Sequence, residues 1–386
     1  MLALPFATAA FGAKKAPVSK DVKFTLYGTE MQARFDASKP VRIKKTTDKE
    51  VLKCVKWLEA NTANTVTDCL KLKNEYNLCD WAYVKLLDKL AKTALGNTNE
   101  AVLLMGTLLD KSGYRTLIGR NSTGRQLYVF YGADAFVYRT SYFEENGETF
   151  FLYGDSVNFS KTGLLNVIKA AGKPVSFRIQ GEQKLAEKLT APKTVKSAKN
   201  PDFAFTYSVN QNLIDFYGEY PSICFNNDFT TRWSFMADQP LEPRLQNTLV
   251  KDMKRKLAGK KQKDAVQQIL WWVQTGFEYG SDQDLWGYDR AFWAEETLSY
   301  PKNDSEDRAI LFTRLVRDVL GLKTMLVYYP QHMSTAVCIT DEAVKGGAYE
   351  VLNGWHYVIC EPNDVGKIGD EMPTVKGKDT KVIPLK

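Results

Sequence analysis

Three polar residues in the C-terminal half have the types and the order that acyl-transfer chemistry requires. Ser305 opens a stretch with helical periodicity, His332 opens a strand pattern 27 residues later, and Glu361 follows another strand pattern after 29 more. A nucleophile at a helix N-terminus meets unpaired N–H groups and the positive end of the helix dipole. Histidine on a facing strand takes and returns the proton, and a carboxylate orients the imidazole. The spacing therefore predicts a Ser305-His332-Glu361 triad.

The segments that carry these residues resemble the transglutaminase-like family of the papain-type cysteine hydrolases, in particular exported members common in Bacteroidetes-type bacteria. In that family the helix starts with aspartate–cysteine–glutamate–aspartate, a glycine precedes the histidine, and the acid segment starts with aspartate–proline. The corresponding segments here are DSED at 304–307, QHMSTAV at 331–337 and EP at 361–362, with further similarity at 205–221, 272–279 and 294–301. The resemblance implies a papain-like fold and a covalent acyl intermediate.

Three family positions are altered in this sequence. Ser305 stands at the cysteine position, Gln331 at the glycine position and Glu361 at the aspartate position. A serine hydroxyl has no accessible anion near neutral pH, and glutamate is one methylene longer than aspartate. The departures favour a catalytically silent protein that retains its cleft for a peptide. The alternative is an active amide-bond hydrolase or acyl transferase that uses the same three residues. An engineered cysteine-to-serine change would explain only the first departure.

Each candidate residue also has a simpler interpretation. Serine is a favoured residue at helix starts, so Ser305 can be an ordinary capping residue followed by first-turn acids. His332 can be a hydrogen-bonded strand histidine. Gln274 can line the oxyanion side of the site, as a glutamine does in papain-like folds, or it can cap or pack on its helix. Cys338 and Cys360 are excluded as nucleophiles, since neither starts a helix.

The surrounding periodicities predict an α+β fold with two domains, each with helices packed on an antiparallel sheet. Helices are expected at 47–58, 78–95, 100–109, 264–277 and 305–320. Strands are expected within 22–35 (turning through Gly28) and at 114–119, 126–132, 136–139, 323–329, 333–340, 349–352 and 356–360. Hairpin turns are expected at 146–147 and 353–354, where both sequences read Asn-Gly.

The two halves resemble each other when the first is moved forward by 208 residues. Six identities then appear between residues 97 and 132, and the expected helix end, strand starts and Asn-Gly turn agree in order. This pattern indicates an internal duplication, with two unrelated α+β domains as the alternative. The alignment places Asn97, Gly124 and Gly154 at the three triad positions, so the first copy is predicted to be degenerate.

The chain organisation follows from these patterns. Residues 1–21 are expected to be a leader with a signal-peptide remnant and a cleavage site near Ala10, 22–183 the N-terminal domain, 184–204 a linker, and 205–386 the C-terminal domain. The leader favours export to the periplasm or cell envelope, although an accidental match is the alternative. No apolar run is long enough to predict a transmembrane span.

Composition limits the classes of partner. The net charge is +7 and lysines gather at 184–199 and 251–263, but no nucleic-acid motif accompanies them. A peptide or protein ligand is expected, no nucleic acid, and no cofactor or metal; an anionic polymer on the lysine clusters remains an alternative. The six cysteines form no CxxC pair, and whether Cys69 and Cys79 bridge stays open, as does the oligomeric state.

Overall fold

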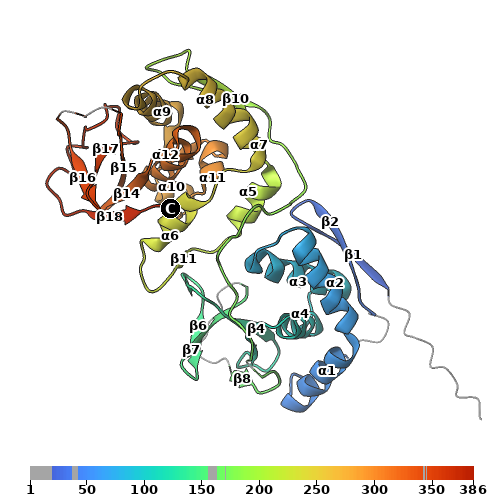
Figure 1. Cartoon of the computed structure of the whole chain (residues 1–386). Helices are drawn as coiled ribbons and strands as arrows, with labels where there is room; N and C mark the ends of the chain where they lie inside the picture. Colours follow the sequence, from blue (N-terminus) through green and yellow to red (C-terminus); the bar gives the residue numbers. More distant parts are fainter. Residues whose placement is uncertain (1–19, 37–41, 155–162, 170, 342–343, 345) are drawn as a thin grey trace, which may run out of the picture.

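The computed structural model of the chain describes residues 20–36, 42–154, 163–169, 171–341, 344 and 346–386. The leader and its expected cleavage site near Ala10 lie outside the described residues, apart from the last two leader positions. Figure 1 shows an α+β molecule in which helices pack against two separate curved antiparallel sheets, as the sequence predicts for the fold class. Among the described residues, no helix has both the length and the apolar character needed to cross a bilayer.

The first half begins with a hairpin of β1 (Asp21–Leu26) and β2 (Thr29–Arg34), which turns through Tyr27 and Gly28, both at positive φ. The helices α1 (Asp48–Asn61), α2 (Ala63–Glu75), α3 (Asp80–Leu95) and α4 (Asn99–Lys111) follow. The expected helices at 47–58, 78–95 and 100–109 are thus confirmed, and α2 is an additional one. The first sheet has the order β6-β7-β4-β3-β8, with bounds Tyr142–Glu145, Glu148–Leu152, Leu127–Gly132, Thr116–Arg120 and Gly163–Leu165.

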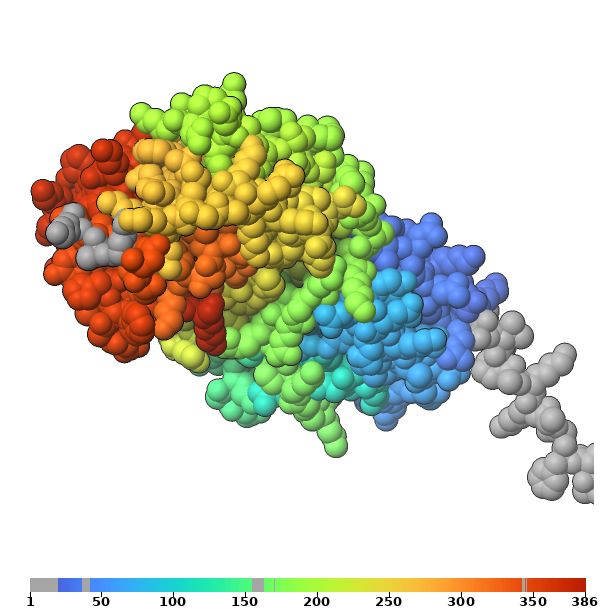
Figure 2. All heavy atoms as spheres, turned by 45° about the horizontal axis from the view of Figure 1, so that its top comes forward, coloured from blue at the N-terminus to red at the C-terminus, as the bar shows by residue number. Residues whose placement is uncertain are grey.

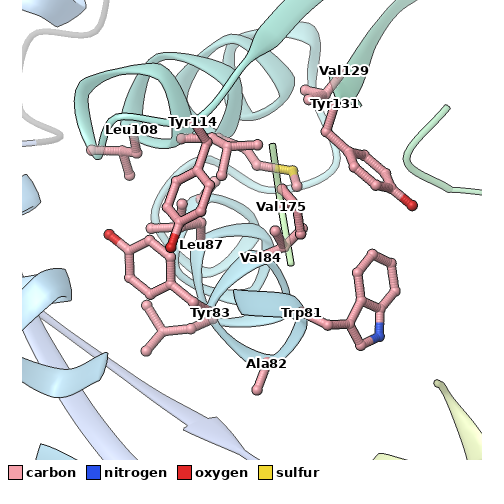
Figure 3. Packing of buried hydrophobic residues seen from close by; sticks show 14 of the residues in the cluster. Trp81, Ala82, Tyr83, Val84, Leu87, Leu108, Tyr114, Val129, Tyr131 and Val175 are labelled. Carbon is pink, nitrogen blue, oxygen red and sulfur yellow. The ribbon is translucent and has the colours of Figure 1, made fainter. Parts of the chain in front are cut away.

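The core of the first half is rich in aromatic residues from α3, α4 and the sheet. Figure 3 shows Trp81 and Tyr83 of α3 facing Tyr131 and Tyr114, which come from β4 and the segment after α4. The ring centroids of Trp81 and Tyr131 lie 5.9 Å apart, and those of Tyr83 and Tyr114 lie 6.0 Å apart. Rings that bury this much area supply a large share of the apolar stabilisation of a core.

The second half has the same plan. Its sheet has the order β16-β17-β15-β14-β18, with bounds Tyr349–Leu352, Trp355–Cys360, His332–Val337, Thr324–Tyr329 and Lys381–Pro384. The helix α12 (Ser305–Leu320) packs on β14 and β15, and α9 (Gln262–Gly276), α11 (Ala294–Ser299) and α6 (Thr231–Asp238) pack on α12. Further helical segments are α5 (Gln211–Gly218), α7 (Pro243–Leu245), the π-helical turn η1 (Gln246–Val250), α8 (Lys251–Leu257) and α10 (Asp282–Leu285).

The expected linker contributes ordered structure. Within it, β9 (Lys193–Lys196) pairs with β10 (Ala204–Tyr207), and Val195 is buried in the second core. The chain also returns to the first half after residue 205, because β11 (Ile223–Cys224) pairs with β5 (Phe136–Val137). The remaining short strands β12 (Glu278–Tyr279) and β13 (Lys302–Asn303) pair in parallel just before α12. Figure 2 shows the blue residues of the first half and the orange and red residues of the second half on opposite sides, with residues drawn in green between them.

The two cores meet at α5 and α11. Leu213 and Tyr217 of α5 pack in the first core, while Ile214 packs in the second. A cavity of about 270 Å³ lies at this junction, and the Glu295 side chain of α11 lines it. Glu295 is 2% exposed and accepts a hydrogen bond from the Glu242 N–H at 3.0 Å. Burial, together with the nearby Glu242 and Glu296 charges, raises the pKa of Glu295 to about 8.

Glu295→Gln should make the free energy of unfolding less dependent on pH in the neutral and basic range. The folded protein binds this proton up to about pH 8, whereas the unfolded chain releases it near the ordinary glutamate pKa. The free energy of unfolding should therefore fall as pH rises through this window, by up to about 1.4 kcal/mol per pH unit for one proton. Denaturant titrations from pH 4 to 9 measure this slope, and it should be smaller in Glu295→Gln. The exposed Glu182→Gln change serves as control, and an unaltered slope in Glu295→Gln would contradict the assignment.

Candidate functional site

The structure brings His332 and Glu361 together. β15 and β17 are adjacent antiparallel strands in which Thr335 pairs with Cys360, so the first residue of β15 lies near the residue that follows β17. The Nε2 atom of His332 and the Oε2 atom of Glu361 are 2.8 Å apart. Their side chains are only 10% and 4% exposed. Because Nε2 is engaged by the carboxylate, Nδ1 remains for a second partner, as in a histidine oriented for proton transfer.

The loop after Glu361 is held by two amide side chains. The other carboxylate oxygen of Glu361 accepts hydrogen bonds from the Asn363 N–H at 3.0 Å and the Asn363 side chain at 2.9 Å. Gln274, at the end of α9, donates to the backbone carbonyls of Glu361 and Asp364, both at 2.7 Å. Gln274 therefore fixes the acid loop with its NH₂ group. Asn363 was not identified from the sequence, because an isolated asparagine after a strand carries no distinctive signal.

Ser305 occupies the first residue of α12, as the sequence predicts. The helix is capped by Asp304 through a capping box with Asp307, and Gly321 ends it in the left-handed conformation at φ 67°. The Ser305 hydroxyl donates to the Glu306 carboxylate at 3.2 Å. Among the described residues, no hydrogen bond joins Ser305 to His332. The three predicted residues thus divide into a bonded His332-Glu361 pair and a serine that is bonded within its own helix turn.

Several acids surround Ser305. Carboxylate oxygens of Asp282, Asp304 and Glu306 lie within 4.8 Å of one another. Burial, followed by the charges of Glu306 and Asp282, raises the pKa of Asp304 to about 9. Burial and the Glu306 charge likewise raise the pKa of Asp282 to about 6. The sequence places Glu306 in the first turn, but Asp282 lies 23 residues before Ser305 and is brought in only by the fold.

This charge environment opposes an anionic nucleophile. Asp307 is fully buried, and its carboxylate accepts hydrogen bonds from the backbone N–H groups of Phe292 and Asp304 at 2.7 and 3.1 Å. Its burial, and the nearby Asp304 and Glu306, hold its pKa well above the usual range. The charge of Glu306, which raises the pKa of Asp304 and Asp282, would likewise disfavour a negative charge at position 305. The acids therefore offset the stabilisation that the α12 dipole offers to an anion.

The connection between β14 and β15 contains only Pro330 and Gln331, because Tyr329 pairs with His332. Gln331 has a φ of 67°, in the left-handed region. Proline followed by a residue with positive φ is typical of a type II turn, in which the second position favours glycine. The backbone at position 331 thus favours glycine, which is also the residue that the transglutaminase-like resemblance implies there. This chain has a glutamine at that position instead.

The cysteines do not take part in the site. All six are buried free thiols, so Cys69 and Cys79 do not bridge in this structure. Burial raises the pKa of both Cys69 and Cys79 to about 12. His356 is exposed and packs against Tyr349, with ring centroids 4.9 Å apart. The buried thiols agree with the exclusion of Cys338 and Cys360 as nucleophiles.

Comparison of the chain with protein-family models, with curated proteins and with solved structures finds no match.

Gln331→Gly should stabilise the protein. Glycine adopts positive φ without the Cβ strain that glutamine has there, although it also increases the entropy of the unfolded chain. We expect a net gain of about 0.5–1 kcal/mol in the free energy of unfolding. Thermal and urea unfolding measure it. Asn353→Gly is the matched control, because asparagine already tolerates its φ of 53° and should gain less. A lower unfolding midpoint in Gln331→Gly would exclude strain at this turn.

Proposed function

We propose that this chain is a transglutaminase-like protein with a Ser-His-Glu remnant of a Cys-His-Asp triad, catalytically silent and binding a peptide or protein in the cell envelope. The observation that carries the proposal is the hydrogen bond from the Ser305 hydroxyl to Glu306, inside a cluster of acids with raised pKa values. If His332 is to activate the serine as a general base, the Ser305 hydroxyl must point to the imidazole. The surrounding charges must also favour an oxyanion.

The order of the elements supports the family part of the proposal. A buried helix begins at the nucleophile position, the next strand hairpin carries the histidine, and the acid follows a neighbouring strand. The His332-Glu361 hydrogen bond is the interaction that the resemblance implies for histidine and acid. On this proposal the protein acts after export, needs no cofactor, and binds no nucleic acid.

The two sheets support an internal duplication. When the strands are numbered along the chain, both sheets have the same strand order and the same antiparallel pairing. In each half the helix that precedes the sheet, α4 or α12, packs on the second of these strands, β4 or β15. We therefore propose two transglutaminase-like domains, of which the first is degenerate.

The alternative function is an active amide-bond hydrolase or acyl transferase. The observation that favours it is the His332-Glu361 pair, in which the imidazole is already oriented and its Nδ1 is left for a partner. In that mechanism the Ser305 oxygen attacks the amide carbon, His332 takes the hydroxyl proton and returns it to the leaving amine, and water then hydrolyses the acyl-serine.

Turnover measurements separate the two functions. The full chain, Ser305→Ala and Ser305→Cys should be incubated with a γ-glutamyl p-nitroanilide, with release of p-nitroaniline and any acyl-protein followed by absorbance and mass spectrometry. We expect the unmodified protein and Ser305→Ala to release p-nitroaniline at the same rate. Release that disappears in Ser305→Ala would instead establish the hydrolase.

The effect of the acids is measurable on a thiol placed at the same position. In Ser305→Cys the nearby carboxylates should hold the thiol pKa up and slow its reaction with iodoacetamide at pH 7. Adding Glu306→Gln should speed that reaction about tenfold, since removing one close charge shifts such a pKa by about one unit. Adding the distant Glu350→Gln instead is the control. Equal rates in the three variants would show that the acids do not govern reactivity at position 305.

A further inference from the structure

We propose that the first half carries its own binding groove, at the start of α4, which takes an acidic peptide. This inference rests on the proposed function, since it names the cleft and the class of peptide through which a silent protein acts. It places binding in the half that has no histidine, away from Ser305.

In the first sheet, the groove lies at the place that corresponds to the position of His332 and Glu361 in the second sheet. Thr116 pairs with Tyr131 as Thr324 pairs with Val337, and Phe130 pairs with Leu152 as Ala336 pairs with Ile359. Counting along the strands from these pairs, Gln126 corresponds to His332 and Gly154 to Glu361. The sequence alignment placed Gly124 at the histidine position, and this is wrong by two residues because the connection between β3 and β4 is longer than that between β14 and β15.

The corresponding positions leave the site open instead of filling it with catalytic groups. Both Gln126 and Gly154 line a cavity of about 880 Å³ at the start of α4. A Cβ atom added at Gly154 would meet no atom within 4 Å. An adjoining cavity of about 430 Å³ shares Asn99 and Arg125 with the first. Together the two cavities form one groove along the start of β4, which we call the α4 groove.

The charge of the α4 groove selects an anion. Its lining includes Lys44, Lys45, Lys92, Arg120 and Arg125, whereas Asp88 is the only acid among the lining residues that the structure describes. Lys92 pairs with Asp88 at 2.8 Å, and Arg120 pairs with Asp48 at 3.0 Å.

Three cations are left for a ligand. The exposed side chains of Lys44, Lys45 and Arg125 have no ion-pair partner among the described residues. They line the same cavity as Asn99, the first residue of the 13-residue helix α4, where the helix dipole also favours negative charge.

The walls of the α4 groove are fixed by hydrogen bonds. The Asn99 side chain donates to the Arg125 carbonyl and accepts from the Leu127 N–H, both at 2.9 Å. Arg120 donates to the Thr46 carbonyl at 2.6 Å, and Thr46 donates to the Gly124 carbonyl. A groove that is ordered before binding loses less entropy when a ligand arrives.

The lining favours a peptide over a nucleic acid. Ala101, Val102 and Met105 provide an apolar floor for side chains, and Asn97 and Gln126 supply amides for a peptide backbone. Single-stranded nucleic acid binds on exposed aromatic faces. Two tyrosines contribute to this lining. Tyr128 is only 9% exposed, and the half-buried Tyr153 ring packs against Trp81 with centroids 6.0 Å apart and against the Lys85 ammonium, so neither offers an open face.

Fluorescence anisotropy tests the proposal with the full chain and a fluorescein-labelled peptide Gly-Ala-Leu-Gly-Glu-Glu that has a free C-terminus. The double variant Lys45→Glu, Arg125→Glu should weaken binding at least tenfold. Binding should also weaken as salt rises. Lys254→Glu together with Lys263→Glu makes the same charge change on α8 and α9 and should leave affinity unchanged. Circular dichroism confirms that each variant is folded.

Three outcomes would overturn the proposal. These are an unchanged affinity in the groove variant, equal binding of the amidated Gly-Ala-Leu-Gly-Gln-Gln peptide, or preferred binding of a dT12 oligonucleotide. Failure here differs from failure of the proposed function. If Ser305→Trp, which places a large ring at the start of α12, abolishes peptide binding while the groove variant does not, the peptide binds at the C-terminal site and the silent-protein proposal stands. Ser305-dependent turnover would refute silence without affecting binding at the α4 groove.

Discussion

Burial of α12 is the constraint on which the second half depends. This helix is enclosed by α9, α11 and α6 on one side and by β14 and β15 on the other, and every residue from Asp307 to Val316 is buried. A helix buried over this length must also pair its polar side chains, and Arg308, Thr313 and Arg314 do so through hydrogen bonds. Its capping box and Gly321 then fix where it starts and ends, and hence where Ser305 lies. The sheet that covers it fixes His332 and Glu361 independently of the helix.

On the proposed function, the first turn of α12 keeps the framework of a catalytic site without its electrostatics. A helix start next to a histidine–carboxylate pair is suited to an anionic nucleophile. Here Asp282, Asp304 and Glu306 crowd that start, and the Glu306 charge already occupies the end of the dipole that an oxyanion would otherwise use. The corresponding end of α4 has lysines and arginine nearby instead. The two halves therefore present opposite charges at equivalent places of their folds.

Local patterns in the sequence predict the regular elements well, since α12, β16 and the Asn-Gly hairpins depend on periodicity and turn chemistry within a few residues. The His332-Glu361 pair was also predictable, because two neighbouring strands bring these residues together. Elements that depend on distant partners were not: β18 forms only by pairing with β14, and Asp282 reaches Ser305 only through the tertiary fold. The positive φ of Gln331 was invisible because glutamine gives no signal for such a turn.

The aromatic wall between the two cores has a consequence for how the molecule comes apart. Tyr217 stacks on Trp293 with centroids 4.6 Å apart, and Trp293 in turn meets Tyr220 and Phe235 at 5.6 and 5.2 Å. The helix α5 gives side chains to both cores. Separation of the halves would therefore expose several rings of the first core at once. We therefore expect the two halves to unfold as a single cooperative unit, although their sheets are built separately.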